Sequence, residues 1–282
     1  KENFFSYVDL MRLNRPVGIL LLLWPTLWGL WLASDGSPNV SIVLIFISGV
    51  ILMRSAGCVI NDYADRNIDK YVKRTKNRPI TSGKISNRSA LILFFILITI
   101  SFTLVLFLNK LTIILSVFAA VFASTYPFMK RYTNFPQAYL GISFAWSIPM
   151  AFASHKNSLP VELLWIVLSV IIWVIIYDTI YAMVDRDDDL KIGVKSTAIF
   201  FGKMDTFAIG ILHILLILVL YKCGLEFDLG KFFHLSLICA SLLVIYHQWL
   251  IRDRNRDRCL KAFLNNHWIG AFIFLGIIAD RF

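Results

Sequence analysis

Aspartates that could bind a divalent cation occur in two matched clusters of the sequence. Asp65 and Asp69 are four residues apart in the first cluster, and Asp185 and Asp189 have the same spacing in the second. On a helix, residues four apart lie on one face, where two carboxylates repel each other unless a cation sits between them. Carboxylate oxygens suit Mg²⁺, which shares its remaining coordination sites with substrate phosphate. The two pairs therefore predict a site for Mg²⁺ and a diphosphate, with these four carboxylates as metal ligands.

The pattern Asp-Arg-x-x-Asp begins at both 65 and 185, and a basic segment and a glycine follow each copy. This repeat suggests two related helical halves, roughly 1–130 and 131–282, within a single domain that spans 1–282. Asn61 is a further candidate metal ligand, since its neutral oxygen adds no repulsion. Asp62 and Asp187, taken alone, are interpreted as solvated or helix-capping residues.

Charged residues inside apolar segments are costly in a membrane and are usually functional. Arg54 is one such residue, and it lies seven positions before Asn61, about two helical turns, on the same helix face. Snorkelling of its side chain to the interface is the alternative interpretation. Asp178 is similarly placed, and it could orient a phenol or an arginine, or serve as a buried structural partner.

Basic and aromatic side chains near the clusters provide groups for a diphosphate and an organic substrate. Arg74 and Arg78 are four apart and could make bidentate contacts to phosphate oxygens. Lys130 is a further candidate for diphosphate binding, and Tyr126, four residues earlier, has an aromatic face that could stabilise a carbocation. Arg131 could serve the second substrate or the diphosphate, or could only mark one side of a membrane.

The elements that must position these residues are long apolar segments. Of the 282 residues, 58% are apolar and 16% are charged, whereas soluble domains are typically about 45–50% apolar and about 25% charged. This composition excludes an ordinary soluble globule, a disordered chain and a disulfide scaffold, and it indicates an all-α membrane protein. Nine segments are predicted to cross the membrane: Val17–Ala33, Val40–Val59, Ala90–Leu108, Leu111–Phe128, Gln137–Ser154, Val161–Met183, Met204–Tyr221, Phe232–Leu250 and Ala262–Ala279.

The distribution of Lys and Arg predicts the orientation. Nine spans place 22 of the 28 basic residues on the side of the N-terminus and five on the other side, with Arg54 inside a span. Such an excess marks the cytoplasmic side. The net charge of +10 therefore reflects topology and predicts no nucleic-acid partner. No cleavable signal peptide is expected, and the basic run 252–258 is interpreted as a solvated loop near anionic lipid head groups.

The aspartate motifs, Asn61-Asp-x-x-Asp65-x-x-x-Asp69 and Asp185-x-x-x-Asp189, resemble those of the UbiA superfamily of intramembrane prenyltransferases. The resemblance covers essentially the whole chain. Further segments are similar to the branch of this superfamily that prenylates 4-hydroxybenzoate, namely Arg12–Gly18, Trp24–Trp28, Asn77–Ile80, Tyr126–Arg131 and Asp178–Asp189.

This resemblance implies nine transmembrane helices around a central cavity, capped on the cytoplasmic side by the loops after the second and sixth helices. It implies Mg²⁺ as cofactor, a polyprenyl diphosphate donor and 4-hydroxybenzoate as acceptor, in the ubiquinone pathway of a bacterial inner membrane. Arg54 would then bind the acceptor carboxylate, with Arg131, Asp178 and Tyr126 as further acceptor-binding candidates. Arg74, Arg78 and Lys130 would bind the diphosphate.

Two alternatives remain open on the sequence. The acceptor could be a different molecule, such as 1,4-dihydroxy-2-naphthoate, homogentisate or haem. A cation- or proton-coupled transporter is a second alternative, but transporters carry acidic residues near the bilayer midplane. Here the acidic residues gather at one membrane edge beside basic loops, which favours a phosphate ligand.

Overall fold

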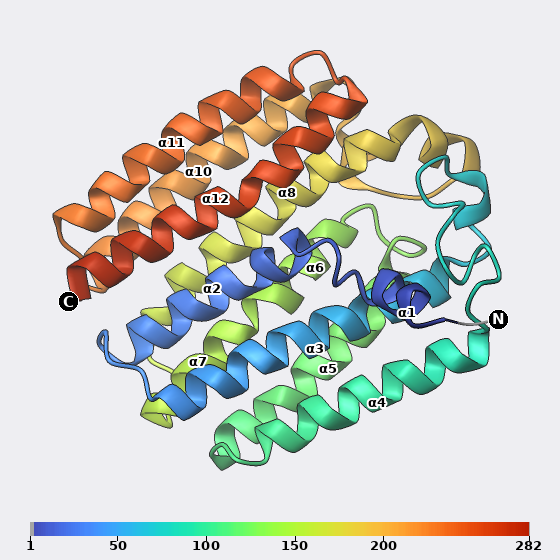
Figure 1. The fold of residues 1–282 in the computed structure, drawn as a ribbon. Coiled ribbons are helices and arrows are strands. Elements are labelled where there is room, and N and C mark those ends of the chain that lie inside the picture. Colours follow the sequence, from blue (N-terminus) through green and yellow to red (C-terminus); the bar gives the residue numbers. More distant parts are fainter. Residues whose placement is uncertain (1–2, 282) are drawn as a thin grey trace.

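The computed structural model describes residues 3–281, and every regular element in this range is helical (Figure 1). The elements, in chain order, are α1 (Phe4–Met11), α2 (Val17–Ala33), α3 (Val40–Asp65), the 3₁₀ turn η1 (Asp69–Tyr71), α4 (Asn87–Val105), α5 (Lys110–Met129), α6 (Pro136–Ala145), α7 (Ser147–Lys156), α8 (Leu163–Ile192), α9 (Thr197–Phe201), η2 (Gly202–Met204), α10 (Asp205–Glu226), α11 (Lys231–Ile251) and α12 (Arg256–Arg281).

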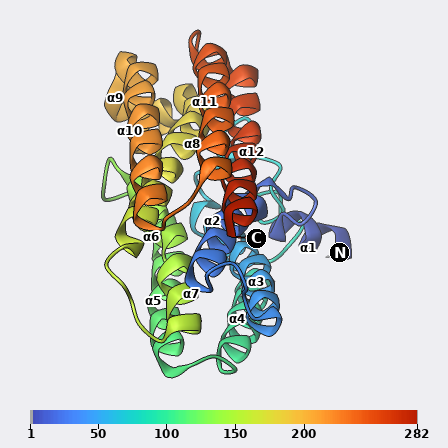
Figure 2. The same ribbon diagram turned by 90° about the vertical axis from the view of Figure 1, so that its left-hand side faces the viewer.

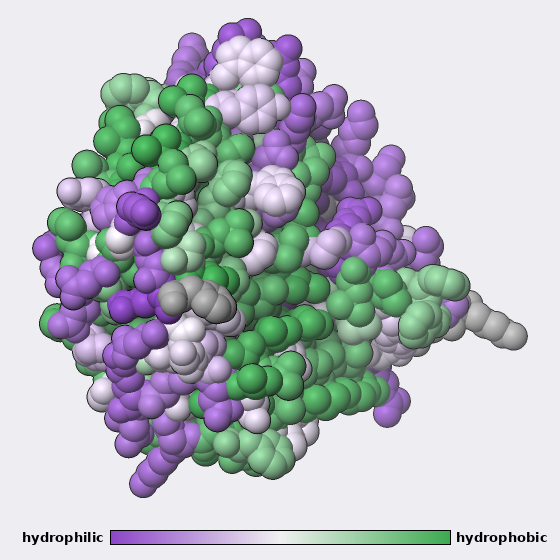
Figure 3. Space-filling model, turned by 60° about the vertical axis from the view of Figure 1, so that its left-hand side comes forward, coloured by the Kyte–Doolittle hydropathy of each residue, from purple (hydrophilic) through white to green (hydrophobic). Residues whose placement is uncertain are grey.

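Seven of the described helices are long and apolar enough to cross a membrane: α3, α4, α5, α8, α10 with α9 before it, α11 and α12. The shorter apolar helix α2 has 17 residues. Each of the nine predicted segments coincides with helical structure, so the structure confirms an all-helical membrane protein. Apolar residues cover a broad band of the face shown in Figure 3, as expected for a surface in contact with lipid.

The fifth predicted segment, Gln137–Ser154, is not one helix but two, because it is interrupted at Trp146 between α6 and α7. Pro149 gives the physical reason. Proline has no N–H to donate to the carbonyl of Ala145 four residues earlier, and its ring clashes with that carbonyl. Residues on both sides of the interruption, Phe144 of α6 and Ser147 of α7, line the large cavity described below.

The long helix α8 lies at the centre of the bundle. Figure 1 shows α10, α11 and α12 on one side of α8 and α3, α4 and α5 on the other, and in Figure 2 α8 lies among α10, α11 and α12, with α3, α4 and α5 below them. Trp173 of α8 stacks on Trp28 of α2, with ring centroids 5.4 Å apart, and the Trp28 indole donates to the carbonyl of Gly270 on α12. A Cβ on Gly270 would lie 2.6 Å from Trp173, so glycine is needed there for α2, α8 and α12 to pack.

Helices α3 and α8 continue past the predicted membrane segments and carry aspartates at their ends. The second predicted membrane segment ends at Val59, whereas α3 continues to Asp65. The sixth predicted segment ends at Met183, whereas α8 continues to Ile192. Prediction from apolar runs finds the part of a helix in lipid but not its polar continuation. Both extended ends lie at the same end of the bundle (Figure 1).

The two aspartate pairs differ in backbone structure. Asp185 and Asp189 lie on α8, as predicted, and this helix ends in a left-handed Gly193. The prediction that Asp65 and Asp69 share one helix face is wrong, because α3 ends at Asp65. The chain then turns, the Ile68 N–H donates to the Asp65 carbonyl, and Asp69 begins η1.

Candidate active site

The two aspartate clusters meet in a cavity of about 150 Å³ at the end of the bundle. Asn61 and Asp65 reach it from α3, Asp69 from η1, and Asp185 and Asp189 from α8. The cavity is also lined by the predicted diphosphate-binding residues Arg74, Arg78 and Lys130. The fold therefore brings together carboxylates that are separated by 120 residues in the sequence.

In the first cluster each carboxylate has a cationic partner. Lys130 pairs with Asp65, and Arg78 donates to Asp69 at 2.7 Å and lies 3.0 Å from Asp62. Asp62 also accepts from Arg12 at 2.9 Å. The interpretation of Asp62 as a solvated residue is wrong, since it is completely buried. It joins the α1–α2 connection to the α3–α4 loop because it binds an arginine from each.

The second cluster is held by a residue from the first loop. The Arg74 Nε donates to Asp185 at 3.1 Å, and the Arg74 guanidinium lies 4.7 Å from the centre of the Tyr181 ring. Tyr181 in turn stacks on Phe263 of α12 at 4.3 Å. Arg74 thus connects the α3–α4 loop to the acidic end of α8.

The donor set of this cavity fits Mg²⁺. Among residues 3–281 no group of three or more His, Cys, Asp or Glu forms a compact metal cluster, and the aspartates face guanidinium and ammonium groups instead. One oxygen of Asp65, which lines the cavity, is nevertheless buried without a hydrogen-bond partner. Burial raises the pKa of Asp69, and the neighbouring Asp65 and Asp62 raise it further against the opposing effect of Arg78. Unpartnered, mutually repelling carboxylate oxygens are groups that a divalent cation would stabilise.

A larger cavity of about 790 Å³ extends from the acidic site into the apolar part of the bundle. The two cavities share six lining residues: Asn61, Arg74, Arg78, Tyr126, Asp178 and Tyr181. Most other lining residues of the large cavity are apolar and come from α2, α3, α4, α5 and α6. A charged site is thus continuous with an apolar chamber, within the size range of small-molecule sites.

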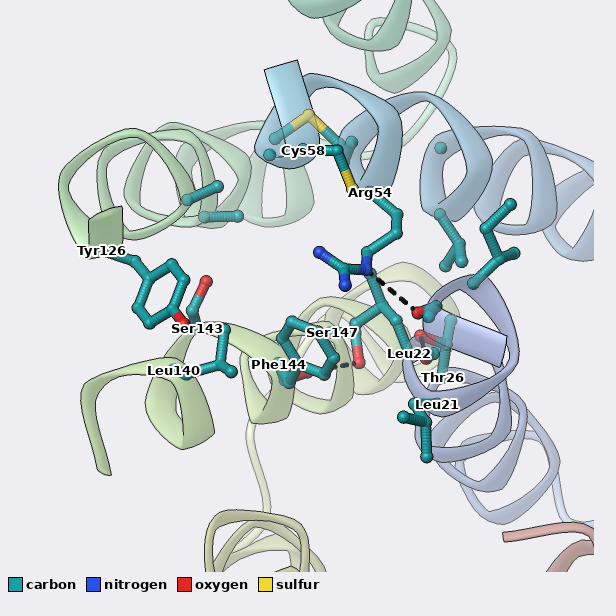
Figure 4. Close-up of a pocket in the computed structure, with 18 of the residues that line it drawn as sticks. Leu21, Leu22, Thr26, Arg54, Cys58, Tyr126, Leu140, Ser143, Phe144 and Ser147 are labelled. Atoms are coloured by element: carbon teal, nitrogen blue, oxygen red, sulfur yellow. Dashed lines mark hydrogen bonds between the residues drawn. The ribbon is translucent and has the colours of Figure 1, made fainter. Parts of the chain in front are cut away.

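Arg54 projects from α3 into the large cavity, between Tyr126 of α5, Phe144 of α6 and Leu22 of α2 (Figure 4). Its Nε donates to the Gly18 carbonyl at 3.2 Å, and it makes no ion pair with any of the described residues. A Cβ on Gly18 would lie 2.8 Å from an Arg54 nitrogen, so glycine leaves the room that the guanidinium occupies. This guanidinium is therefore available to an anionic group inside the cavity.

The structure does not bring every predicted residue into the site. Arg131 lines neither cavity, and its guanidinium donates to the Ala64 carbonyl at 2.7 Å near the end of α3. Conversely, Arg12 and Arg15 line the large cavity, although neither was predicted as a site residue. Their position in the segment Arg12–Gly18, which carries part of the family resemblance, was the available signal.

A family model for the UbiA prenyltransferase family matches residues 22–275. An all-helical membrane protein with an acidic cavity above an apolar chamber agrees with that class, and the chain belongs to the UbiA prenyltransferase family. A 4-hydroxybenzoate octaprenyltransferase from Alkalilimnicola ehrlichii is 53% identical over 280 residues, 99% of this chain and 96% of that protein. One from Hahella chejuensis is 55% identical over 97% of this chain and 91% of the relative.

Solved structures share this fold. The apo structure of a UbiA homolog from Aeropyrum pernix K1 superposes with a TM-score of 0.83 at 26% identity, and covers 94% of this chain and 98% of that one. A UbiA homolog from Archaeoglobus fulgidus bound to GPP and Mg²⁺ has a TM-score of 0.71 at 16% identity, over 97% of this chain and 99% of that one. At that identity the likeness concerns the fold alone.

Proposed function

We propose that the protein is a 4-hydroxybenzoate octaprenyltransferase that depends on Mg²⁺. It would transfer the prenyl group of a polyprenyl diphosphate to ring carbon 3 of 4-hydroxybenzoate, a step of ubiquinone biosynthesis. The octaprenyl length and the acceptor follow the names of relatives that are more than 50% identical over nearly the full chain. The observation that carries the proposal is Arg54, whose guanidinium has no ion-pair partner among residues 3–281 and lies in a cavity continuous with the acidic site.

The donor diphosphate would bind where the two aspartate clusters meet. Asp65, Asp69, Asp185 and Asp189, with Asn61, would hold Mg²⁺, which when bound neutralises the diphosphate and stabilises it as a leaving group. Arg74, Arg78 and Lys130 now pair with these aspartates. Metal binding to the carboxylates would free the three basic side chains for charge-assisted hydrogen bonds to phosphate oxygens. The prenyl chain would extend into the apolar chamber.

The acceptor would bind between Arg54 and the diphosphate. Arg54 offers a planar pair of donors to the acceptor carboxylate. Tyr126 and Asp178 line both cavities, which suits a role beside the phenol and the reacting carbon. The bond between the allylic carbon and the diphosphate oxygen breaks, and the ring carbon ortho to the phenol forms the new carbon–carbon bond. Loss of the ring proton then restores aromaticity.

The predicted topology completes the proposal. Counting α6 and α7 as one span and including α2 gives nine crossings around the central cavity, in a bacterial inner membrane. The N-terminus and the loops that follow α3 and α8 would be cytoplasmic. The loop after α8 is tied down, because the Thr197 N–H donates to Gln137 and the Lys195 N–H donates to the Lys130 carbonyl. These loops would form the cytoplasmic cap of the acidic cavity.

An acceptor competition assay tests the proposal. Purified protein in lipid nanodiscs with Mg²⁺ and octaprenyl diphosphate should prenylate 4-hydroxybenzoate in preference to dihydroxynaphthoate and homogentisate. Preferential prenylation of another acceptor would overturn the assignment of 4-hydroxybenzoate.

A further inference from the structure

Asp205, the first residue of α10, is a completely buried carboxylate that lines neither cavity. The Arg254 Nε donates to its Oδ1 at 2.8 Å, and the Arg254 Nη2 lies 2.7 Å from the same oxygen. Arg186 lies 3.4 Å from the Oδ2 of Asp205. The Thr206 N–H donates to Oδ1, the oxygen that Arg254 contacts, at 2.7 Å. A buried charge with two arginines is not explained by anything in the proposed reaction.

The two arginines come from distant parts of the chain. Arg186 is on α8, next to Asp185, whereas Arg254 lies in the connection between α11 and α12. Arg254 has a φ of 51°, a left-handed conformation that is unfavourable for a residue other than glycine. Its side chain also donates to the Lys203 carbonyl at 2.5 Å. Such a conformation persists when the surrounding contacts determine it, and here those contacts are Asp205 and Lys203.

These contacts hold the acidic end of α8 on the side away from the diphosphate cavity. Arg74 pairs with Asp185 on the cavity side. On the opposite side Arg186 reaches Asp205, and Arg256 lies 3.4 Å from Asp188. The last turns of α8 are thus fixed between the α3–α4 loop and the α11–α12 connection. The basic run 252–258 is therefore not simply a solvated loop, since Arg254 and Arg256 face the protein.

We propose that Asp205, with Arg186 and Arg254, is a positioning network that sets the direction of Asp185 and Asp189 for metal and diphosphate binding. This inference rests on the proposed role of these two aspartates. Buried ion pairs are often retained for reasons other than stability, because desolvation offsets much of their attraction. Residues that orient metal ligands typically change metal affinity or activity by about 10- to 100-fold when they are mutated. Asp205 contacts Arg186 of the ligand-bearing helix directly, and Arg254 acts on that helix through Asp205.

The test is a Mn²⁺ titration followed by electron paramagnetic resonance, with Mn²⁺ in place of Mg²⁺ and a non-hydrolysable geranyl thiolo-diphosphate present. We expect Asp205→Asn and Arg254→Gln to weaken Mn²⁺ binding by about 10- to 100-fold, and Arg254→Lys to weaken it less. The matched control is Arg252→Gln, since the Arg252 side chain is 54% exposed and its contacts, an ion pair with the exposed Asp253 and a position over the Trp249 ring, lie outside the network. Control and wild-type affinities should agree within about twofold.

A kinetic measurement separates positioning from a merely structural role. In turnover assays the network variants should need more Mg²⁺ while the KM for 4-hydroxybenzoate stays unchanged. Wild-type Mn²⁺ affinity in folded Arg254→Gln protein would overturn the proposal, even if Asp205→Asn fails to fold. If the wild-type protein binds Mn²⁺ with the donor analogue but does not prenylate 4-hydroxybenzoate, the proposed acceptor is refuted and the proposed positioning network is not.

Discussion

The two aspartate clusters have the same sequence spacing but different structures. In the first, the helix ends between Asp65 and Asp69, and both carboxylates are buried, Asp69 against Arg78 of the following loop and Asp65 against Lys130 at the end of α5. In the second, Asp185 and Asp189 lie on one continuous helix and are partly exposed, with Arg74 arriving from the other half of the chain. The cationic partners of the first cluster thus all come from the same half of the chain, residues 1–130, whereas the second cluster depends on residues from other elements that hold α8.

The largest expected effect comes from removing one charge from either cluster. Asp65→Asn and Asp185→Asn should each lower kcat by about 10²–10³-fold, the size of effect seen when one electrostatic group is lost at a reacting centre. Steady-state kinetics at saturating Mg²⁺, with circular dichroism to check folding, measures this. Near-normal turnover in one of the two variants would mean that only one cluster serves the reaction.

Asp62 and Asp187 provide a sharper comparison. Both were predicted to be solvated or helix-capping residues, but Asp62 is buried and Asp187 is exposed. Asp62→Asn removes the charge shared by Arg12 and Arg78, and should raise the KM for the prenyl diphosphate by about 10- to 100-fold. The Asp187 side chain is 79% exposed, so Asp187→Asn should leave kinetics and stability nearly unchanged. Equal effects of the two substitutions would contradict the distinction drawn from burial.

Substitution of Arg54 distinguishes acceptor binding in the large cavity from metal and diphosphate binding at the two acidic clusters. Arg54→Ala should raise the KM for 4-hydroxybenzoate by about 10- to 100-fold, because a charge-assisted contact to a carboxylate is typically worth about 1.5–3 kcal/mol. The KM for the donor should not change, and Arg54→Lys should recover part of the loss. A change confined to the donor KM would assign Arg54 to the diphosphate instead.

The smallest expected effect concerns the turn that distinguishes the first cluster. The buried Thr75 hydroxyl donates to the Asp69 carbonyl at 3.1 Å and so fixes η1. Thr75→Val should increase the Mg²⁺ concentration needed for half-maximal activity about fivefold, corresponding to one hydrogen bond of about 1 kcal/mol. Thr103→Val is the control, since it removes a similar hydroxyl contact from the exposed face of α4. Indistinguishable results for the two variants would show that η1 does not need this bond.

The sequence predicted the fold well where apolar runs determine it and less well where polar contacts do. The apolar segments located the membrane helices, and Pro149 was the only local signal for the break between α6 and α7. Spacing alone could not show that α3 ends at Asp65, because the same spacing in α8 remains helical. Asp62, Asp205 and Arg131 each have at least one partner 49 to 67 residues away in the chain, which no local pattern reveals.

A structure with Mn²⁺ and a geranyl thiolo-diphosphate tests the central claim most directly. We expect anomalous density for the metal beside Asp65, Asp69, Asp185 and Asp189, with Arg74, Arg78 and Lys130 moved from these carboxylates to the diphosphate. Metal density away from both clusters, with the present ion pairs of Asp65, Asp69 and Asp185 intact, would contradict the account.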